Sequence, residues 1–285
     1  MAVLATAALF STGGAAIKAT HLAGPQVSCL RSVIAALAFL ALVPAARRLP
    51  SWREWLVGCA YAGALVFFAL ANKLTTAANT IFLQSTAPLY ILFLGPWLLR
   101  ERIARRDLVF LAAAAAGLSL FFLDVDPPQA TAPDPLLGNL LALASGLCWA
   151  LTLVGLRWLG SRGQNVSAVV AGNVVASLAC LPFVGSLAAV AATDWIVLLW
   201  LGVFQVALAY VLLTRALKRI PAFEASILLL LEPVLNPVWA WIFHGEVPGG
   251  WALAGGAILI GATIVHDRLV ERRGPPEEDA GATAP

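Results

Sequence analysis

A carboxylate, an amide and two prolines interrupt one of the most apolar stretches of the chain, ILLLLEPVLNPVWAWIF at residues 227–243. These residues are Glu232, Asn236, Pro233 and Pro237. A carboxylate at the centre of a bilayer costs about 3 kcal/mol, and each proline frees backbone groups that only neighbouring protein can satisfy. Polar residues kept at this cost indicate either a binding site or a specialised helix break.

Two interpretations of Glu232 are open. As a cavity carboxylate, it would bind a substrate amine or a coupling proton. As a support or gate at a helix break, it would bind backbone groups freed next to Pro233.

Further polar and aromatic residues lie deep in apolar stretches. Interhelical hydrogen bonding explains the polar residues Asn79, Gln84, Asn173, Gln205 and Tyr210 about as well as a cavity does. Packing is the favoured role of Trp149, Trp239 and Trp241. Gln84, Gln205 and Glu232 lie nearest the middle of their stretches. The candidate residues for a substrate pathway are Ser11, Gln84, Pro88, Ser145, Trp149, Gln205, Tyr210, Glu232, Pro233, Asn236 and Trp239.

The residue types that catalysis or metal binding would need are scattered. The three histidines, His21, His244 and His266, each lie near an end of an apolar stretch and form no HExxH motif. The four cysteines lie inside apolar stretches without CxxC spacing. We therefore expect no enzyme activity, no metal site and no cofactor.

The elements that position these residues must be membrane helices. Of the 285 residues 61% are apolar and only 12% are charged, against about a quarter charged in soluble proteins. A crossing needs about 20 apolar residues. The sequence predicts ten crossings, at residues 2–20, 26–44, 54–72, 76–98, 107–123, 136–157, 166–190, 194–215, 222–243 and 249–266.

The breaks between crossings divide the chain. The longest break, residues 124–135, is rich in proline and aspartate and separates five crossings in residues 1–123 from five in residues 136–268. Residues 269–285 have the composition of a disordered tail.

Basic residues gather on one side of the predicted membrane. If the N-terminus is cytoplasmic, fifteen of the eighteen lysines and arginines are cytoplasmic, which predicts both termini inside. They are Arg47, Arg48, Arg53, Arg100, Arg102, Arg105, Arg106, Arg157, Arg162, Arg215, Lys218, Arg219, Arg268, Arg272 and Arg273.

The remaining charged residues near helix ends have a simpler expectation. Lys18 and Arg31 are expected to reach the headgroups with their long side chains. Glu101 and Glu246 are expected to be solvated.

The two halves resemble one another. Pro88 aligns with Pro233 and Glu101 with Glu246, both at a separation of 145 residues, and a weaker overlay pairs Ser11 with Ser145. Since each half holds an odd number of crossings, the repeat is inverted, as in many secondary transporters. Glu232 faces Ala87 in this overlay, so we favour the role of Glu232 as a local support or gate.

The strings TAPLYILFLGPWLLRE and LEPVLNPVWAWIFHGE, with a first helix of small residues, resemble the EamA branch of the drug/metabolite transporter superfamily. The resemblance covers the chain to about residue 268, and within the branch it is similar to YddG-type amino acid exporters. It implies an all-α integral membrane fold, with two inverted five-helix repeats around a central cavity.

The resemblance also implies a secondary transporter that exports small metabolites, with neutral or aromatic amino acids preferred, in the bacterial inner membrane. Multidrug efflux and nucleotide-sugar transport are the alternatives. A multidrug transporter of the small type would be expected to carry an acidic residue in its first helix, and residues 1–20 contain none. A nucleotide-sugar carrier would need cations at mid-membrane to bind phosphates, and none is expected there. The expected partners are a small-molecule substrate and the lipid bilayer, with no nucleic acid and a monomer as the working hypothesis.

Overall fold

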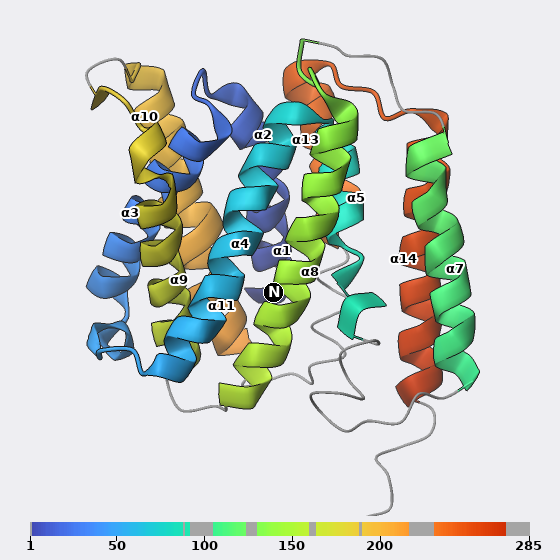
Figure 1. The fold of residues 1–285 in the computed structure, drawn as a ribbon, viewed down its shortest axis with the longest axis horizontal. Helices are drawn as coiled ribbons and strands as arrows, with labels where there is room; N and C mark the ends of the chain where they lie inside the picture. Colours follow the sequence, from blue (N-terminus) through green and yellow to red (C-terminus); the bar gives the residue numbers. More distant parts are fainter. Residues whose placement is uncertain are drawn as a thin grey trace, which may run out of the picture.

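The structure is a computed structural model, and it describes residues 2–87, 89–91, 105–123, 130–159, 164–187, 190–216 and 231–271. These residues are almost entirely helical and contain no β-strand (Figure 1). The helices are α1 (Ala2–Ser11), α2 (Gly13–Ala19), α3 (Gly24–Leu42), η1 (Pro44–Arg47), α4 (Trp52–Leu74), α5 (Ala77–Gln84), α7 (Arg105–Leu123), α8 (Pro135–Leu159), α9 (Gln164–Cys180), η2 (Leu181–Phe183), α10 (Ala192–Leu199), η4 (Trp200–Leu208), α11 (Ala209–Ala216), α13 (Leu231–His244) and α14 (Gly250–Glu271).

Several of these elements are long and apolar enough to cross a membrane. Within the described ranges they are Gly24–Leu42, Trp52–Leu74, Pro135–Leu156, Asn165–Phe183 and Ala192–Leu212. The prediction of an all-helical membrane protein is confirmed. Pro88, Glu101, most of the linker at residues 124–135 and nearly all of the predicted tail lie outside the described residues.

Three predicted crossings differ from the structure within the described residues. The crossing expected at residues 76–98 is interrupted after Gln84, where α5 ends and Ser85 and Thr86 form a turn. The crossing expected at residues 166–190 ends as an α-helix at Cys180, because Pro182 has no backbone N–H and disfavours helical geometry in the residue before it. The crossing expected at residues 2–20 is interrupted at Thr12, where α1 gives way to α2. Gly13 and Gly14 follow this interruption and lower the helix propensity there.

The crossing at residues 194–215 changes its helical pitch midway. It starts as α10, continues as the π-helix η4 from Trp200 to Leu208 and ends as α11. Short π-helical stretches inside α-helices frequently mark functional sites, and nine residues is a long one. Gln205 lies within η4.

The helices form one tightly packed group and one peripheral pair. In the group, α4 contacts α8 and α9, α3 contacts α9 and η4, α1 contacts α11 and α13, and α5 contacts α8 and α13. Glycines permit close crossings: a methyl group added to Gly58 of α4 would lie 2.8 Å from the backbone nitrogen of Gly172 of α9.

The peripheral pair consists of α7 and α14, which run side by side at one edge of the molecule (Figure 1). It reaches the group through α5: a methyl group added to Gly256 of α14 would lie 2.8 Å from the Phe82 ring. The candidate pathway residues that the structure describes all lie in the group, and none lies in α7 or α14.

Candidate functional site

The interruption at Thr12 is held by side chains from its own helix and from two others. Ser11 Oγ donates to the Ala8 carbonyl at 2.8 Å, and Thr12 Oγ1 donates to the Leu9 carbonyl at 2.7 Å. Trp239 of α13 donates its indole N–H to Ser11 Oγ at 2.9 Å, and Trp200 of η4 donates to Thr12 Oγ1 at 3.0 Å. The interruption thus lies where three crossings meet.

Three amide side chains converge on the two glycines that follow. A methyl group added to Gly14 would lie 2.6 Å from Asn236 Oδ1 and 3.0 Å from Asn72 Oδ1. A methyl group added to Gly13 would lie 2.9 Å from Gln205 Nε2. Only glycine lets these amides approach the helix so closely. Asn72, Gln205 and Asn236 are here called the amide cluster.

The amide cluster is buried and poorly satisfied. Asn72 and Asn236 have no solvent-exposed surface, and Gln205 is 8% exposed. Asn72 donates to the Phe68 carbonyl of its own helix at 2.9 Å, but its Oδ1 has no partner among the residues that the structure describes. Both polar atoms of Asn236 and the Oε1 of Gln205 are also without one. More than nine in ten buried polar groups in proteins have partners. Asn79 Oδ1 and Asn173 Oδ1 are also unpartnered among the described residues, but only in Asn236 are both side-chain polar atoms without a partner.

Gln84 and Ser145, two further predicted pathway residues, bond to one another. Gln84 Nε2 donates to Ser145 Oγ at 2.7 Å, and Ser145 Oγ donates to the Ala64 carbonyl at 2.9 Å. Ser145 of α8 thus accepts from α5, as Ser11 of α1 accepts from α13. The overlay of Ser11 on Ser145 is matched by similar contacts.

The predicted aromatic candidates Trp149 and Tyr210 belong to a packed cluster. Tyr61 has ring contacts with both, at centroid distances of 6.5 Å and 5.7 Å. Tyr210 also contacts Phe10 at 5.5 Å and Phe39 at 6.4 Å, edge to face. These rings stabilise one another, which agrees with the packing role favoured for Trp149.

Glu232 and Pro233 occupy the first described turn of α13. Glu232 is half-buried, and its carboxylate interacts electrostatically with Tyr210. It has no hydrogen bond or ion pair with any residue that the structure describes. α13 continues through Pro237, which has no N–H, so the Pro233 carbonyl four residues earlier lacks its helical donor. The described part of this crossing is nevertheless unbroken, whereas the first crossing is interrupted at Thr12 and the fourth at Ser85 and Thr86.

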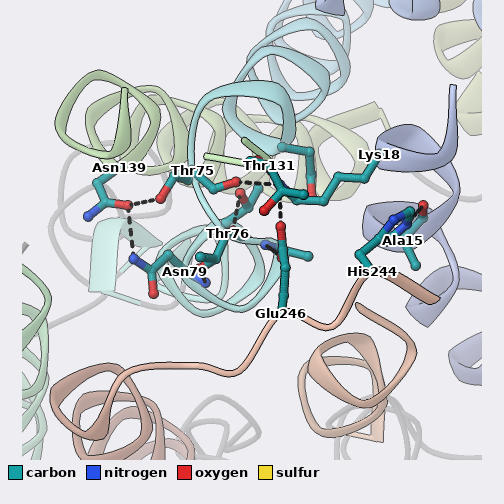
Figure 2. Close-up of polar contacts among 12 residues, drawn as sticks. Ala15, Lys18, Thr75, Thr76, Asn79, Thr131, Asn139, His244 and Glu246 are labelled. Carbon is teal, nitrogen blue, oxygen red and sulfur yellow. Dashed lines mark hydrogen bonds and ion pairs between the residues drawn. The ribbon is translucent and has the colours of Figure 1, made fainter. Parts of the chain in front are cut away.

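A second polar group, the Lys18 cluster, joins α2, the end of α4, the start of α5 and the loop after α13 (Figure 2). Lys18 Nζ forms an ion pair with Glu246 Oε1 at 2.7 Å and donates to the carbonyls of Thr75, at 2.8 Å, and Thr131. Glu246 Oε2 accepts from the backbone N–H of Ala77 at 2.9 Å. Because Ala77 is the first residue of α5, the carboxylate also caps that helix.

Two further polar contacts lie near the Lys18 cluster, at the same ends of the helices. Lys73 Nζ donates to the Thr20 carbonyl at 2.6 Å, and Asp194 Oδ1 accepts from the backbone N–H of His21 at 3.0 Å. Asp194 lies in the first turn of α10, so this contact too joins residues far apart in sequence.

Three expectations about charged residues are wrong. Lys18 and Glu246, expected to be solvated or at the headgroups, have side chains only 3% and 4% exposed and pair with one another. Arg31 is 1% exposed and donates to the Leu65 carbonyl at 3.1 Å, so it does not reach the headgroups. Arg31 is also a buried cation, so a lack of buried cations does not exclude phosphate-bearing substrates. The sequence places Arg31 near a helix end, but it does not show that α4, which carries Leu65, lies beside it.

Among the predicted residues, the structure thus brings together Ser11 with Trp239, Gln205 and Asn236 near the Thr12 interruption, Gln84 with Ser145, and Trp149 with Tyr210 through Tyr61. Asn72, Gly13 and Gly14 were missed. Across the described ranges, no group of three or more metal-ligating side chains occurs.

Comparisons with known proteins agree with this arrangement. The model of the EamA-like transporter family matches twice, at residues 1–123 and 136–266. The threonine/homoserine exporter RhtA of Salmonella typhimurium is 31% identical over 218 residues, which cover 73% of this chain and 72% of the relative. RhtA of Escherichia coli K12 is 28% identical over 192 residues, covering 66% of this chain and 62% of the relative.

Two further similarities cover more of the chain. The uncharacterized protein PA1977 of Pseudomonas aeruginosa is 31% identical over 263 residues, covering 86% of this chain and 87% of the relative. A crystal structure with 20% sequence identity superposes with a TM-score of 0.64, over 96% of this chain and 98% of the other, and so shares the fold. The chain belongs to the EamA-like transporter family, because the family model matches it twice and because it is 31% identical to a relative over 73% of this chain.

Proposed function

We propose that the protein is a secondary transporter that exports small neutral amino acids by alternating access of two inverted five-helix halves. Membership of the family makes it a multi-pass membrane transporter. The relatives in Salmonella typhimurium and Escherichia coli are named as exporters of threonine and homoserine. Threonine and homoserine are therefore our first candidate substrates.

The pattern of helix contacts carries the alternating-access part of the proposal. Number the crossings in chain order, with α1 and α2 as the first, α5 as the fourth, α10 to α11 as the eighth, α13 as the ninth and α14 as the tenth. Exchange of the halves turns the contact of α4 with α8 into that of α11 with α1. It turns the contact of α5 with α8 into the contact of α13 with α1. It turns the contact of α4 with α9 into the contact of η4 with α3.

Three further contacts are unchanged by the exchange. They pair the second crossing with the seventh, the fourth with the ninth and the fifth with the tenth: α3 with α9, α5 with α13 and α7 with α14. Packing with this exchange symmetry is what two inverted repeats need if they are to rock against one another around a shared site.

The Lys18 cluster supports the same mechanism. Lys18 comes from the first half and Glu246 from the second, so their ion pair holds the halves together at one end. The distribution of basic residues favours this end as the periplasmic one, with both termini cytoplasmic in a bacterial inner membrane. In this reading the structure is closed toward the periplasm, and the ion pair must separate before a substrate leaves.

Large apolar or aromatic amino acids are the second candidate substrates. The aromatic side chains of Tyr61, Trp149 and Tyr210 lie together inside the packed group and could accept an apolar side chain. Their contacts with one another leave them less available, so we place small substrates first.

Transport by purified protein in liposomes tests the proposal. Liposomes preloaded with unlabelled threonine should accumulate labelled threonine by exchange, and a panel with homoserine, phenylalanine and a cationic dye ranks the substrates. Threonine and homoserine should exchange faster than phenylalanine. Movement of the dye with no exchange of any amino acid would instead identify a multidrug efflux protein.

A further inference from the structure

We infer that Asn72 and Asn236, whose side-chain oxygens converge on Gly14, bind the zwitterionic end of the transported amino acid. The inference rests on the proposed function and names the residues that recognise its substrate. It starts from the two amide oxygens that converge on Gly14 without a protein partner.

The chemistry of the two amides matches an ammonium group beside a carboxylate. Because Asn72 Nδ2 donates to the Phe68 carbonyl, the orientation of this amide is fixed and its Oδ1 is available as an acceptor. An ammonium group offers three donors and no acceptor. Asn72 Oδ1 and Asn236 Oδ1 could accept two of them.

Asn236 adds a donor. Its Nδ2 has no partner in the described part of the chain, so one amide plane can accept from the ammonium and donate to the neighbouring carboxylate of the same α-amino acid. Gly14 has no side chain, so the Asn236 and Asn72 oxygens lie within 2.6 Å and 3.0 Å of the position that a methyl group would occupy. The zwitterion has no net charge, which suits a site formed by neutral amides.

The position of these amides in the fold also fits a transport site. Asn72 belongs to the first half of the chain and Asn236 to the second, and Gly14 follows the interruption in the first crossing. In transporters built from inverted repeats, substrates bind between the repeats at discontinuous helices. Relative motion of the halves would change the distance between the two amides and so release the ligand.

A structural role for Asn236 is a poor alternative. A buried amide without partners destabilises a fold relative to an apolar side chain of similar shape. Asn139 is a matched contrast, because it has no exposed surface but its Oδ1 accepts from Thr75 Oγ1 at 2.8 Å and from Asn79 Nδ2 at 3.3 Å. Asn139 therefore serves the fold, whereas Asn236 contributes little to it.

The experiment compares variants of these two asparagines in the full-length protein. Asn236→Leu, and Asn236→Ala in case leucine does not fit, should leave the thermal unfolding temperature unchanged or higher. Both should raise the KM for threonine exchange at least about tenfold, the loss expected for a hydrogen bond to a charged group. Asn139→Leu should lower the unfolding temperature, because it leaves Thr75 and Asn79 without their acceptor.

Ligand analogues test which group is recognised. N-acetyl-L-threonine lacks the ammonium group and L-threonine methyl ester lacks the carboxylate, so neither should inhibit exchange of labelled threonine. Equal inhibition by N-acetyl-L-threonine and by threonine would overturn the inference. So would a requirement for Na⁺ that Asn236→Ala abolishes, because the oxygens would then bind a metal ion.

Two results separate this inference from the proposed function. If wild-type liposomes exchange threonine and the Asn236 variants do so with an unchanged KM, the inference is wrong while the proposed function stands. If wild-type liposomes move no amino acid, and threonine does not raise the unfolding temperature of the purified protein, both are wrong.

Discussion

Gly14 sets how closely the first crossing approaches Asn72 and Asn236. We predict that Gly14→Ala inhibits threonine exchange by at least about tenfold, because its methyl group would lie 2.6 Å from Asn236 Oδ1, and losing one charged hydrogen bond costs this much. Alanine favours a helix over glycine by about 1 kcal/mol, so expression should not fall greatly. Exchange rates at equal protein content measure the effect.

Gly261→Ala is the matched control for this substitution. Gly261 also lies in a helix, α14, but nothing lies within 4 Å of the added methyl group. It should leave exchange unchanged. Equal effects of the two substitutions would contradict a special role of Gly14.

Polarity inside apolar stretches was a good guide to residues that meet in the structure. Ser11, Gln205, Asn236 and Trp239 were selected this way, and they surround the Thr12 interruption, although their role in a pathway stays a prediction. Asn72 was missed because it precedes Lys73 at a predicted helix end, where polar residues are ordinary. The partners of Lys18, Arg31 and Glu246 could not be predicted, because sequence position gives approximate depth but not which helix lies alongside.

At the scale of elements, the ion pair between Lys18 and Glu246 should hold α2 and the end of α13 together. Either Lys18→Ala or Glu246→Ala leaves one buried charge unpaired, and breaking a buried pair costs about 3–5 kcal/mol. Both variants should unfold at lower temperature. The double variant, Lys18→Ala with Glu246→Ala, should lose less than the sum of the two single losses, because it leaves no unpaired charge. Thermal unfolding of all four proteins in detergent measures this coupling, and additive losses in the double variant would argue against it.

Glu232 on α13 offers a second test at this scale. If it supports or gates the crossing, Glu232→Gln keeps its shape and most of its hydrogen-bonding capacity and should retain substantial transport, whereas Glu232→Leu should reduce expression or turnover. A proton-binding carboxylate would behave differently. Glu232→Gln would then lose accumulation driven by a pH gradient but keep exchange. Parallel exchange and gradient-driven assays distinguish the two roles.

The sequence predicted which segments are helices better than it predicted their irregularities. Apolar length located the crossings, since a membrane requires every lipid-exposed backbone group to be bonded. The π-helix η4 has no such signature, because one extra residue per turn hardly changes an apolar pattern. The interruption at Thr12 was foreshadowed by SerThrGlyGly at residues 11–14, which small-residue packing explained equally well.

For the whole molecule, the arrangement in the membrane is directly testable. A reporter fused after Arg273 should be active only if it works in the cytoplasm, and one inserted in the PPQATAP segment only if it works in the periplasm. The basis is that fifteen basic residues share one side. The reverse pattern would place the Lys18 cluster at the cytoplasmic end and would contradict the proposed closed side.

The buried guanidinium of Arg31 has a consequence for biosynthesis. Its partner, the Leu65 carbonyl, is synthesised 34 residues later, a delay of about 2–7 s at bacterial elongation rates of about 5–20 residues per second. Until then α3 carries an unpaired cation whose transfer to lipid costs about 3 kcal/mol. We therefore expect α3 to wait beside the translocon and to enter the bilayer together with α4, as a helical hairpin. A nascent chain truncated before α4 should insert α3 poorly.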